Sequence, residues 1–477
     1  MIPDEYVKRL PGLLAYISEK MPGKNSGATP SSLLIPVEKL DEKLRELAGR
    51  LVRHYPFHQP IYAGQMLKPP HPVAWLAYAL AMTINPNNHA LDGGPEASYM
   101  EKEVMRMLVN MVGFPDDALG HLASSGTIAN LEALWVAREL HPDRPVAVST
   151  MAHYTHQRMG QVLQHPVVVL PEDEDGLPDP HRFDTKGPLP GTVVVTLGTT
   201  GQGRVEPLHR VLEWARTNDV RIHVDAAYGG FFHLLRSSGL IDADLWNVLP
   251  QADSIVIDPH KHGLQPYGCG AVLFRDPAVG RFYRHDSPYT YFTSDDLHLG
   301  EISLECSRAG AAAVALWLTL QLLLPESLPG KIDQIPTGED GAGTGSGLPQ
   351  ILMDCRSAAL GFYAALDEST RFRPVMRPEL DIVSYIPVTR EQTRSAVSRM
   401  SEQILRKGME AESDDQKIYL STLVLNHEEA RRRFPELAPD QDNVRVLRSV
   451  LMKPEHLGFI PELMRRLDQL HVIICQT

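Results

Sequence analysis

The sequence predicts an α/β fold in which helices cover both faces of a mostly parallel central sheet. The first observation is that short β-branched runs alternate with helical patterns between about residues 91 and 275. The runs lie at 146–148, 167–170, 193–195, 222–224 and 255–257. Strands that alternate with helices pair in parallel, and strands buried on both faces are apolar nearly throughout. The second observation is the length of 477 residues, which exceeds what one core holds and predicts a further domain.

Apolar residues at helical spacing predict the helices. Met100, Val104 and Met107 share one face of a helix at 99–112. Further helices are predicted at 37–55, 128–140 and 208–218. The apolar stretch at 311–324 is too short to span a bilayer, so we expect a buried helix there.

A segment rich in Gly and Pro at 329–348 marks the best domain boundary. We predict an N-terminal helical lead-in at 1–90, a large α/β domain at 91–328, a flexible linker at 329–348 and a small α+β domain at 349–477. Within the last part, the pattern predicts helices at 349–366 and 461–470 and strands at 382–386 and 418–424.

Composition excludes several classes of partner. The net charge of −13 is spread without a basic patch, so nucleic acid and anionic membranes are not expected partners. The four cysteines contain no CxxC pair and are too sparse for a disulfide framework or a zinc cluster. The first residues lack the pattern of a signal peptide, so we expect a cytoplasmic protein.

Lys261 lies in the segment 258–263 (Asp-Pro-His-Lys-His-Gly), between two apolar runs at 254–257 and 270–274. A lysine where strands end can act as an amine nucleophile toward an aldehyde. Upstream, the run at 222–224 ends in Asp225. Together these residues predict a pyridoxal 5′-phosphate (PLP) site, in which Lys261 holds the cofactor as a Schiff base and Asp225 keeps its pyridine nitrogen protonated.

Ser125, Gly126 and Thr127 precede the helix predicted at 128–140. Hydroxyl groups and free backbone N–H groups at a helix N-terminus bind anions, and a phosphate monoester fits. A plain Ser/Thr N-cap is the alternative interpretation. Thr200 follows the run at 193–195, where strand ends open into a crevice, although a glycine-rich turn is the alternative there.

His153 follows the run at 146–148, and a lone histidine there is more often structural than functional. His153, His156, His260 and His262 could also suggest a metal. Their spacing lacks a companion carboxylate at the usual offset, so we predict no metal site.

These motifs together resemble those of the group II PLP-dependent amino-acid decarboxylases, which include the aromatic-amino-acid, tyrosine and glutamate decarboxylases. The matching residues occur in the family's order and at similar separations: Ser125-Gly126-Thr127, Ala152-His153, Thr199-Thr200, 223–228 (His-Val-Asp-Ala-Ala-Tyr) and Pro259-His260-Lys261. The likeness runs from about His58 to the end of the chain. It implies a type I aminotransferase-like fold and an obligate homodimer.

The resemblance also implies a role for each matching residue. Lys261 would bind PLP covalently, His153 would stack on its ring, and Asp225 would pair with the pyridinium nitrogen. Ala227 would pack under the ring, and Thr200 would lie close to the cofactor. The residues implied to hold the phosphate are Ser125, Gly126, Thr127 and His260.

Three further residues are candidates for contact with the substrate. The family has a loop after the lysine that often carries a tyrosine able to return a proton to the product, and here we take Tyr289 ahead of Tyr291, with packing as the alternative. Tyr62 lies in a segment that resembles a pocket-lining part of the family. Arg308 could bind the substrate carboxylate or a partner-subunit phosphate, and a salt bridge at a helix end is the alternative.

We therefore predict PLP-dependent decarboxylation of an L-amino acid to an amine and CO₂, with an aromatic substrate such as tyrosine. Aspartate or glutamate is the alternative substrate. A carbon–carbon lyase of the sphingosine-phosphate-lyase type shares several motifs, but the spacing from Lys261 to Cys269 favours a decarboxylase. A scaffold without activity is disfavoured because Lys261, Asp225 and His153 are all present.

Overall fold

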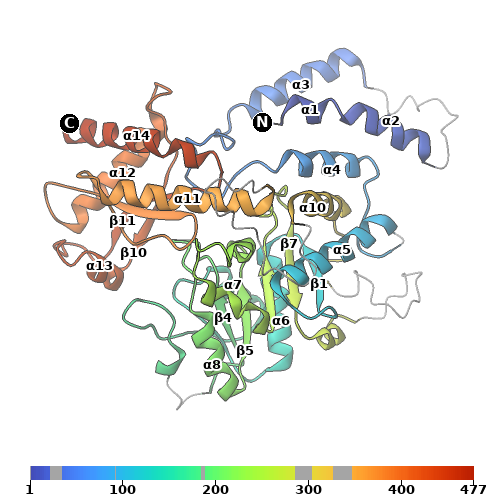
Figure 1. Cartoon of the computed structure of the whole chain (residues 1–477), viewed down its shortest axis with the longest axis horizontal. Helices are drawn as coiled ribbons and strands as arrows, with labels where there is room; N and C mark the ends of the chain where they lie inside the picture. Colours follow the sequence, from blue (N-terminus) through green and yellow to red (C-terminus); the bar gives the residue numbers. More distant parts are fainter. Residues whose placement is uncertain are drawn as a thin grey trace.

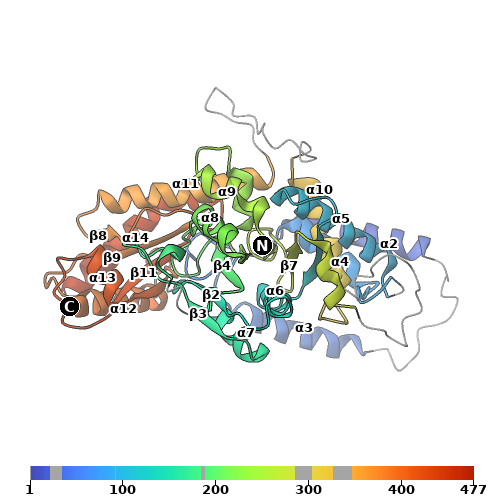
Figure 2. The same cartoon turned by 90° about the horizontal axis from the view of Figure 1, so that it is seen from below.

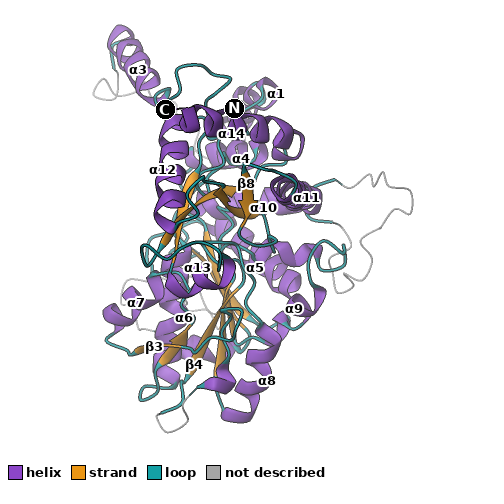
Figure 3. Cartoon of the chain, turned by 90° about the vertical axis from the view of Figure 1, so that its left-hand side faces the viewer, coloured by secondary structure: helices purple, strands orange, loops and turns teal. Residues whose placement is uncertain are grey.

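The computed structural model describes residues 2–21, 35–91, 93–183, 188–284, 303–325 and 346–476. A larger unit is built around a seven-stranded sheet and a smaller unit around a four-stranded sheet. The two units lie side by side, and the N-terminal helices lie over helix α4 (Figure 1). Figure 3 shows both sheets within their helical layers.

The larger sheet has the strand order β1-β7-β6-β5-β4-β2-β3. Its strands are β1 (Leu119–Ala123), β2 (Val146–Val148), β3 (Val167–Val169), β4 (Thr192–Thr196), β5 (Arg221–Asp225), β6 (Ser254–Ile257) and β7 (Gly270–Phe274). The pairs from β6 to β3 are parallel, whereas β7 runs antiparallel to both β6 and β1. The predicted α/β class with a mostly parallel sheet is therefore confirmed.

Helices cover both faces of this sheet. On one face α6 (Gly126–Leu140) packs against a core that includes Val256 of β6. On the other face α5 (Pro95–Val112) and α8 (Leu208–Asn218) join a larger core that includes the adjacent strand residue, Ile255. Successive strand residues point to opposite faces, so a strand with a core on each side is apolar at most positions. This is the physical reason for the unbroken apolar runs of the sequence.

The remaining helices of the larger unit are α7 (Thr155–Leu163), α9 (Ala243–Asn247) and α10 (Gly310–Leu323), with short 3-10 turns η2 (Pro180–Arg182), η3 (Gly230–Leu235), η4 (Leu249–Gln251) and η5 (Pro277–Phe282). Helix α10 packs against α4 and α5, as expected for the apolar stretch at 311–324. Within the described ranges, no helix has both the length and the apolar character needed to cross a membrane.

The smaller sheet has the order β10-β11-β9-β8, and its neighbouring strands are antiparallel. Its strands are β8 (Phe372–Pro374), β9 (Ile382–Pro387), β10 (Ser421–Leu425) and β11 (Val444–Val450), and its helices are α11 (Leu348–Asp367), α12 (Arg394–Glu410), α13 (His427–Arg433) and α14 (His456–Gln476). The strand predicted at 418–424 begins later because Tyr419 pairs with Tyr62 of the lead-in instead of with the sheet.

The helix predicted at 461–470 was too short at both ends. Helix α14 already begins at His456 and holds Pro461 in its interior. A proline there leaves the carbonyl four residues earlier without its helical partner. That residue is Leu457, which is exposed to solvent, so water can satisfy its carbonyl.

The N-terminal helices are α1 (Asp4–Val7), α2 (Leu10–Lys20), α3 (Val37–Leu51) and α4 (Pro72–Met82). Helix α3 has no buried residue and lies at the outside of the molecule in Figure 2 and Figure 3. Helix α4 instead contributes buried residues such as Leu76. Of the predicted linker at 329–348, residues up to 345 lie outside the described ranges, and Leu348 already begins α11.

Candidate active site

A pocket of about 410 Å³ lies at the carboxyl ends of the parallel strands of the larger sheet. Strand β4 ends at Thr196 and β5 at Asp225, while Asp258 follows β6 directly. Parallel strands end at one edge of a sheet, which is where ligands bind in such folds. The pocket is lined by Gly126, Thr127, Asn130, His153, Thr155, Thr196, Gly198, Thr200, Asp225, Ala227, Tyr228, Asp258 and Lys261. Seven residues singled out from the sequence therefore meet here: Gly126, Thr127, His153, Thr200, Asp225, Ala227 and Lys261.

The amine of Lys261 is held by a buried carboxylate. Its Nζ lies 3.0 Å from Oδ2 of Asp258, whose side chain is only 4% exposed. The backbone N–H of Lys261 donates to the carbonyl of Asp258 at 2.9 Å, so a tight turn after β6 fixes both side chains. The second oxygen of Asp258, Oδ1, has no hydrogen-bond partner in the described part of the chain. The pocket thus presents an amine and an incompletely satisfied carboxylate oxygen together.

Both carboxylate oxygens of Asp225 have partners. Oδ2 lies 2.9 Å from Nε2 of His156, and Oδ1 accepts from the backbone N–H of Ala227 at 3.1 Å. Burial alone would raise the pKa of Asp225, but the hydrogen bond and charge of His156, with the charge of Lys261, hold this pKa well below its usual range. A carboxylate that stays ionised in a pocket can pair with a protonated ring nitrogen.

His153 lies on the pocket wall between β2 and α7. Its Nδ1 lies 2.8 Å from Oγ1 of Thr155. Burial lowers the pKa of His153, against the opposing charge of Asp225, so its imidazole is neutral at neutral pH. A neutral planar ring is suited to stacking on another aromatic ring.

The N-terminus of α6 forms another side of the pocket. Gly126 and Thr127 line it at the positive end of the helix dipole, which favours an anion. Ser125 is the N-cap, and its Oγ accepts from the backbone N–H of Ile128 at 3.3 Å. His260 places Nδ1 2.7 Å from the carbonyl oxygen of Cys269. Ser125 and His260 thus lie next to residues of the wall without belonging to it.

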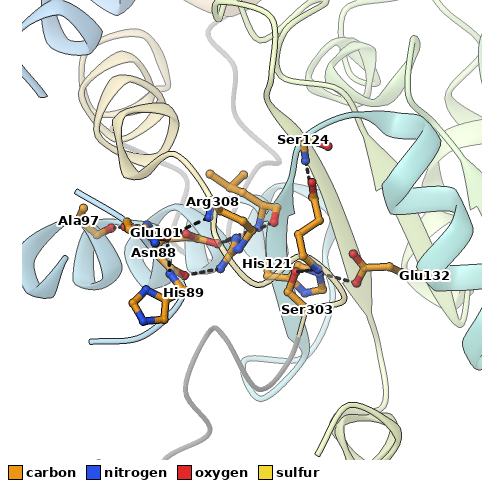
Figure 4. Close-up of polar contacts among 12 residues, drawn as sticks. Asn88, His89, Ala97, Glu101, His121, Ser124, Glu132, Ser303 and Arg308 are labelled. Atoms are coloured by element: carbon orange, nitrogen blue, oxygen red, sulfur yellow. Dashed lines mark hydrogen bonds and ion pairs between the residues drawn. The ribbon is translucent and has the colours of Figure 1, made fainter. Parts of the chain in front are cut away.

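Two of the three candidate substrate contacts, Arg308 and Tyr62, lie outside the pocket wall. The guanidinium of Arg308 contacts Glu101 at 2.6 Å and donates to the carbonyls of Leu122 and Asn88 (Figure 4). These contacts favour the ion-pair alternative for Arg308, and its side chain is not part of the pocket wall. Tyr62 is 4% exposed and also lies outside the wall. Tyr289 lies outside the described residues.

The wall fits PLP in chemistry and in space. It offers an amine for the aldehyde, a carboxylate for the pyridine nitrogen and a helix N-terminus for the phosphate. Two glycines near the N-terminus of α6 leave no room for a larger side chain. A Cβ on Gly126 would lie 2.6 Å from Oδ2 of Asp258, and one on Gly270 would lie 2.5 Å from the carbonyl carbon of Ser125. A larger residue at either position would displace the groups that form the pocket.

Gly126→Ala is expected to weaken PLP binding by about tenfold or more, because the added methyl group pushes Asp258 away from Lys261. The dissociation constant of PLP, measured by titrating the apoprotein, checks this. Gly361→Ala is the matched control, since a Cβ on Gly361 of α11 meets nothing within 4 Å. An unchanged dissociation constant for Gly126→Ala would show that the close contact is not needed.

Several residues of the site were not predicted from the sequence. His156 was considered only as a metal candidate, and Asp258 was given no role. Asn130 lies one helical turn after Gly126, where its Nδ2 donates to the carbonyl of Gly126 at 2.8 Å. Arg448 of β11 donates to the carbonyls of Thr200 and Gly201 at 2.7 and 2.8 Å, so the smaller unit fixes the loop that holds Thr200.

Glu206 is buried behind the pocket. One of its oxygens accepts from the backbone N–H of Thr196 at 2.7 Å, and the other accepts from the hydroxyl of Ser149. Burial raises the pKa of Glu206 to about 7. Its carboxyl group is therefore partly protonated near neutral pH, where an ordinary glutamate is ionised.

Glu206→Gln is expected to remove a pH-dependent loss of stability. Between about pH 5 and 7 the folded protein keeps a proton on Glu206 that the unfolded chain releases, so stability falls as pH rises through this window. The loss amounts to roughly 3 kcal/mol above pH 7. Urea unfolding from pH 5 to 8 checks this, with the exposed Glu213→Gln as control. The same slope in Glu206→Gln and the unmodified protein would contradict the assignment.

Comparison with known proteins now identifies the class. Residues 35–335 match the pyridoxal-dependent decarboxylase conserved domain, so the chain belongs to this family. It is a PLP-dependent amino-acid decarboxylase, as the motifs predicted, and the predicted cofactor is confirmed.

Three curated relatives are decarboxylases. The L-tyrosine decarboxylase of Enterococcus faecium is 28% identical over 424 residues, which covers 66% of this chain and 68% of the relative. The probable L-tyrosine/L-aspartate decarboxylase of Methanothermobacter thermautotrophicus is 30% identical over 267 residues, covering 54% and 70%. The L-2,4-diaminobutyrate decarboxylase of Rhizobium meliloti is 31% identical over 285 residues, covering 55% and 56%.

Solved structures share the whole fold. Mouse CSAD superposes with a TM-score of 0.73 at 19% identity, covering 98% of both chains. The Oryza sativa TDC with PLP and tryptamine superposes with a TM-score of 0.73 at 16% identity, covering 99% of this chain and 98% of that chain. The predicted fold of a PLP decarboxylase, with its small second unit, is confirmed.

Proposed function

We propose that this decarboxylase acts on an aromatic L-amino acid such as tyrosine and releases the corresponding amine and CO₂. The observation that carries the proposal is the E. faecium relative, whose name gives tyrosine and whose alignment spans 424 residues. Aspartate is the second candidate because the M. thermautotrophicus relative is named for both tyrosine and aspartate. Glutamate follows as the other acidic alternative. The relatives described above lend no support to a carbon–carbon lyase of the sphingosine-phosphate-lyase type.

Bound in this pocket, PLP would supply an electron sink for the negative charge that remains on the substrate when CO₂ leaves. Lys261 would bind its aldehyde carbon covalently through Nζ, and Asp258 would hold that amine at the pocket floor. Asp225 would keep the proton on the pyridine nitrogen. His153 and Ala227 would hold the two faces of the ring. Each of these five side chains lines the pocket.

The N-terminus of α6 would bind the phosphate through Gly126 and Thr127, with Ser125 and His260 beside them. Thr200 would lie close to the cofactor ring, in a loop that Arg448 holds. For the proton that returns to the substrate carbon we keep Tyr289 as the candidate donor, on resemblance to the family. Tyr289→Phe would then lower kcat more than Tyr291→Phe does.

The test is a panel of L-amino acids that includes tyrosine, phenylalanine, tryptophan, aspartate, glutamate and 2,4-diaminobutyrate. CO₂ release and amine formation are measured with PLP present, and Lys261→Ala serves as the blank. Tyramine and CO₂ from tyrosine at the highest kcat/KM support the proposal. A preference for aspartate, glutamate or diaminobutyrate overturns the aromatic assignment while leaving the decarboxylase class intact.

We also propose that the enzyme is a homodimer. Support comes from α3, where Val37, Leu40, Leu44, Leu47 and Leu51 recur at intervals of three and four residues and are each 42–65% exposed. Such spacing places them on one helix face. Burying the exposed half of such a leucine against a second copy would contribute about 1 kcal/mol.

Light scattering during gel filtration tests the dimer. The unmodified chain should elute at twice the monomer mass of 53.1 kDa, and Leu44→Glu with Leu47→Glu should shift it toward monomer. Glu42→Lys changes charge on the same helix without touching the apolar positions and should remain dimeric. A monomer at micromolar concentration would overturn the proposal.

We infer a cytoplasmic location from the cysteines. All four are free, and Cys269 and Cys355 are buried as thiols, which is typical of a reducing compartment. Fractionation of the source cells tests the location.

We also propose the division of the chain into four parts with boundaries at residues 90, 328 and 348. Limited proteolysis that cuts first between residues 329 and 348 would support this division.

A further inference from the structure

His156 is a buried histidine behind the pocket to which neither the motifs nor the relatives give a role. It is the second residue of α7, and its backbone N–H donates to the carbonyl of His153 at 3.1 Å. One short turn therefore places His153 on the pocket wall and His156 underneath it. The side chain of His156 is 0% exposed, so it can act only on its immediate neighbours.

The polar contact of the His156 ring is with Asp225. Nε2 lies 2.9 Å from Oδ2 of that carboxylate, whereas Nδ1 has no hydrogen-bond partner in the described part of the chain. The neighbouring His223 is occupied otherwise, because its two nitrogens lie 2.9 Å from Oγ of Ser254 and 2.8 Å from Oδ1 of Asn130. Within the described ranges, His156 is thus the side chain that hydrogen-bonds the carboxylate of Asp225.

We propose that His156 is a positioning residue that fixes the carboxylate of Asp225 in the orientation needed to hold PLP by its ring nitrogen. The inference rests on the function proposed above for Asp225. Oδ1 is already tied to the backbone N–H of Ala227, so the bond from His156 to Oδ2 prevents the carboxylate from rotating about its χ2. A partner of this kind orients the group that contacts the ligand without touching the ligand itself.

The charges that face Asp225 come from several elements. Lys261 and His223 act on it together with His156, and the buried Glu206 lies near enough to interact with it. Lys261 sits on the turn after β6 and serves the aldehyde end of the cofactor. His223 precedes Asp225 on β5 and is directed to Ser254 and Asn130. Removing His156 would therefore leave Oδ2 of Asp225 without its hydrogen-bond donor, and these other groups would not replace that donor.

The experiment compares His156→Phe, which keeps a planar ring without a donor, with His156→Gln, whose amide N–H can still donate. Two quantities are measured: the dissociation constant of PLP on the apoprotein and the pH midpoint at which the ring nitrogen of bound PLP loses its proton, followed by the ¹⁵N chemical shift of ring-labelled PLP. His156→Phe should weaken PLP binding about tenfold, as expected for a lost hydrogen bond to a charged group. It should also lower the pH midpoint by about one unit, because a misplaced Asp225 retains the ring proton less well. His156→Gln should restore part of both.

His121 provides the matched control. It is another fully buried histidine whose Nε2 lies 2.7 Å from a buried carboxylate, that of Glu132, and it lies outside the pocket wall (Figure 4). His121→Phe should cost comparable stability while leaving the PLP dissociation constant and the pH midpoint unchanged.

Asp225→Asn separates failure of this inference from failure of the proposed function. If Asp225→Asn lowers the pH midpoint and neither His156 variant moves it, His156 has no positioning role. If His121→Phe changes both quantities as much as His156→Phe does, the effect is one of general stability and the inference is overturned. If Asp225→Asn itself leaves the midpoint unchanged, the proposed role of Asp225 fails first. Should His156→Phe not fold, His156→Leu, which also removes the donor, takes its place in the same comparison with His156→Gln and the unmodified protein.

Discussion

Lys261→Ala is expected to lose covalent PLP and to lower kcat by about three orders of magnitude or more. Lys261 lines the pocket, and among the described residues it is the one lysine that does so. After dialysis, the variant should have no visible absorbance from covalently bound cofactor. Absorbance spectra before and after dialysis, together with CO₂ release, measure both effects.

Lys261→Arg controls for the loss of an ion pair. Alanine at this position leaves the buried carboxylate of Asp258 without its cation, and that alone destabilises the fold. Arginine keeps a positive charge near Asp258 but does not form the covalent bond. Lys261→Arg should therefore be inactive although it is folded. A protein that stays yellow after dialysis with either variant would contradict the assignment of Lys261.

The motifs identified residues that line one pocket where each position can be read from a short segment of sequence. Lys261 follows β6, Asp225 ends β5, and Gly126 begins α6, so each position can be recognised from an apolar run and its boundary. The strand ends then meet because parallel strands share one carboxyl edge. His156 and Arg448 could not be found in this way, because their partners are 69 and 248 residues away.

The missed elements have similar physical causes. Strand β1 contains Gly120 and the buried His121, so its sequence lacks an unbroken apolar run. The imidazole of His121 can be buried because its Nε2 lies 2.7 Å from a carboxylate oxygen of Glu132. Strand β11 alternates Val444, Arg445 and Val446, a strand signal that we did not use. Its Arg448 can be buried because it donates hydrogen bonds to backbone carbonyls of the larger unit, and only the assembled structure reveals these partners.

Asp225→Ala is expected to retain part of the PLP affinity and to lose turnover by about two to four orders of magnitude. Covalent attachment through Lys261 remains, as do the phosphate contacts at the N-terminus of α6, so binding is weakened but not abolished. Turnover falls further because an unprotonated ring nitrogen withdraws electrons less strongly. Absorbance spectra, the PLP dissociation constant and kcat separate the two effects.

Asp225→Asn distinguishes charge from shape at this position. Asparagine keeps the size of the side chain and one oxygen, yet it has no negative charge to stabilise a protonated ring nitrogen. Since the pKa of Asp225 lies well below its usual range, the unmodified carboxylate stays ionised throughout the neutral range. The stability that the ionised Asp225 carboxylate gives the folded protein is present above about pH 4 and is lost as pH falls further. The kcat of Asp225→Asn should therefore be as low as that of Asp225→Ala between pH 6 and 8, and a near-normal rate would remove Asp225 from the mechanism.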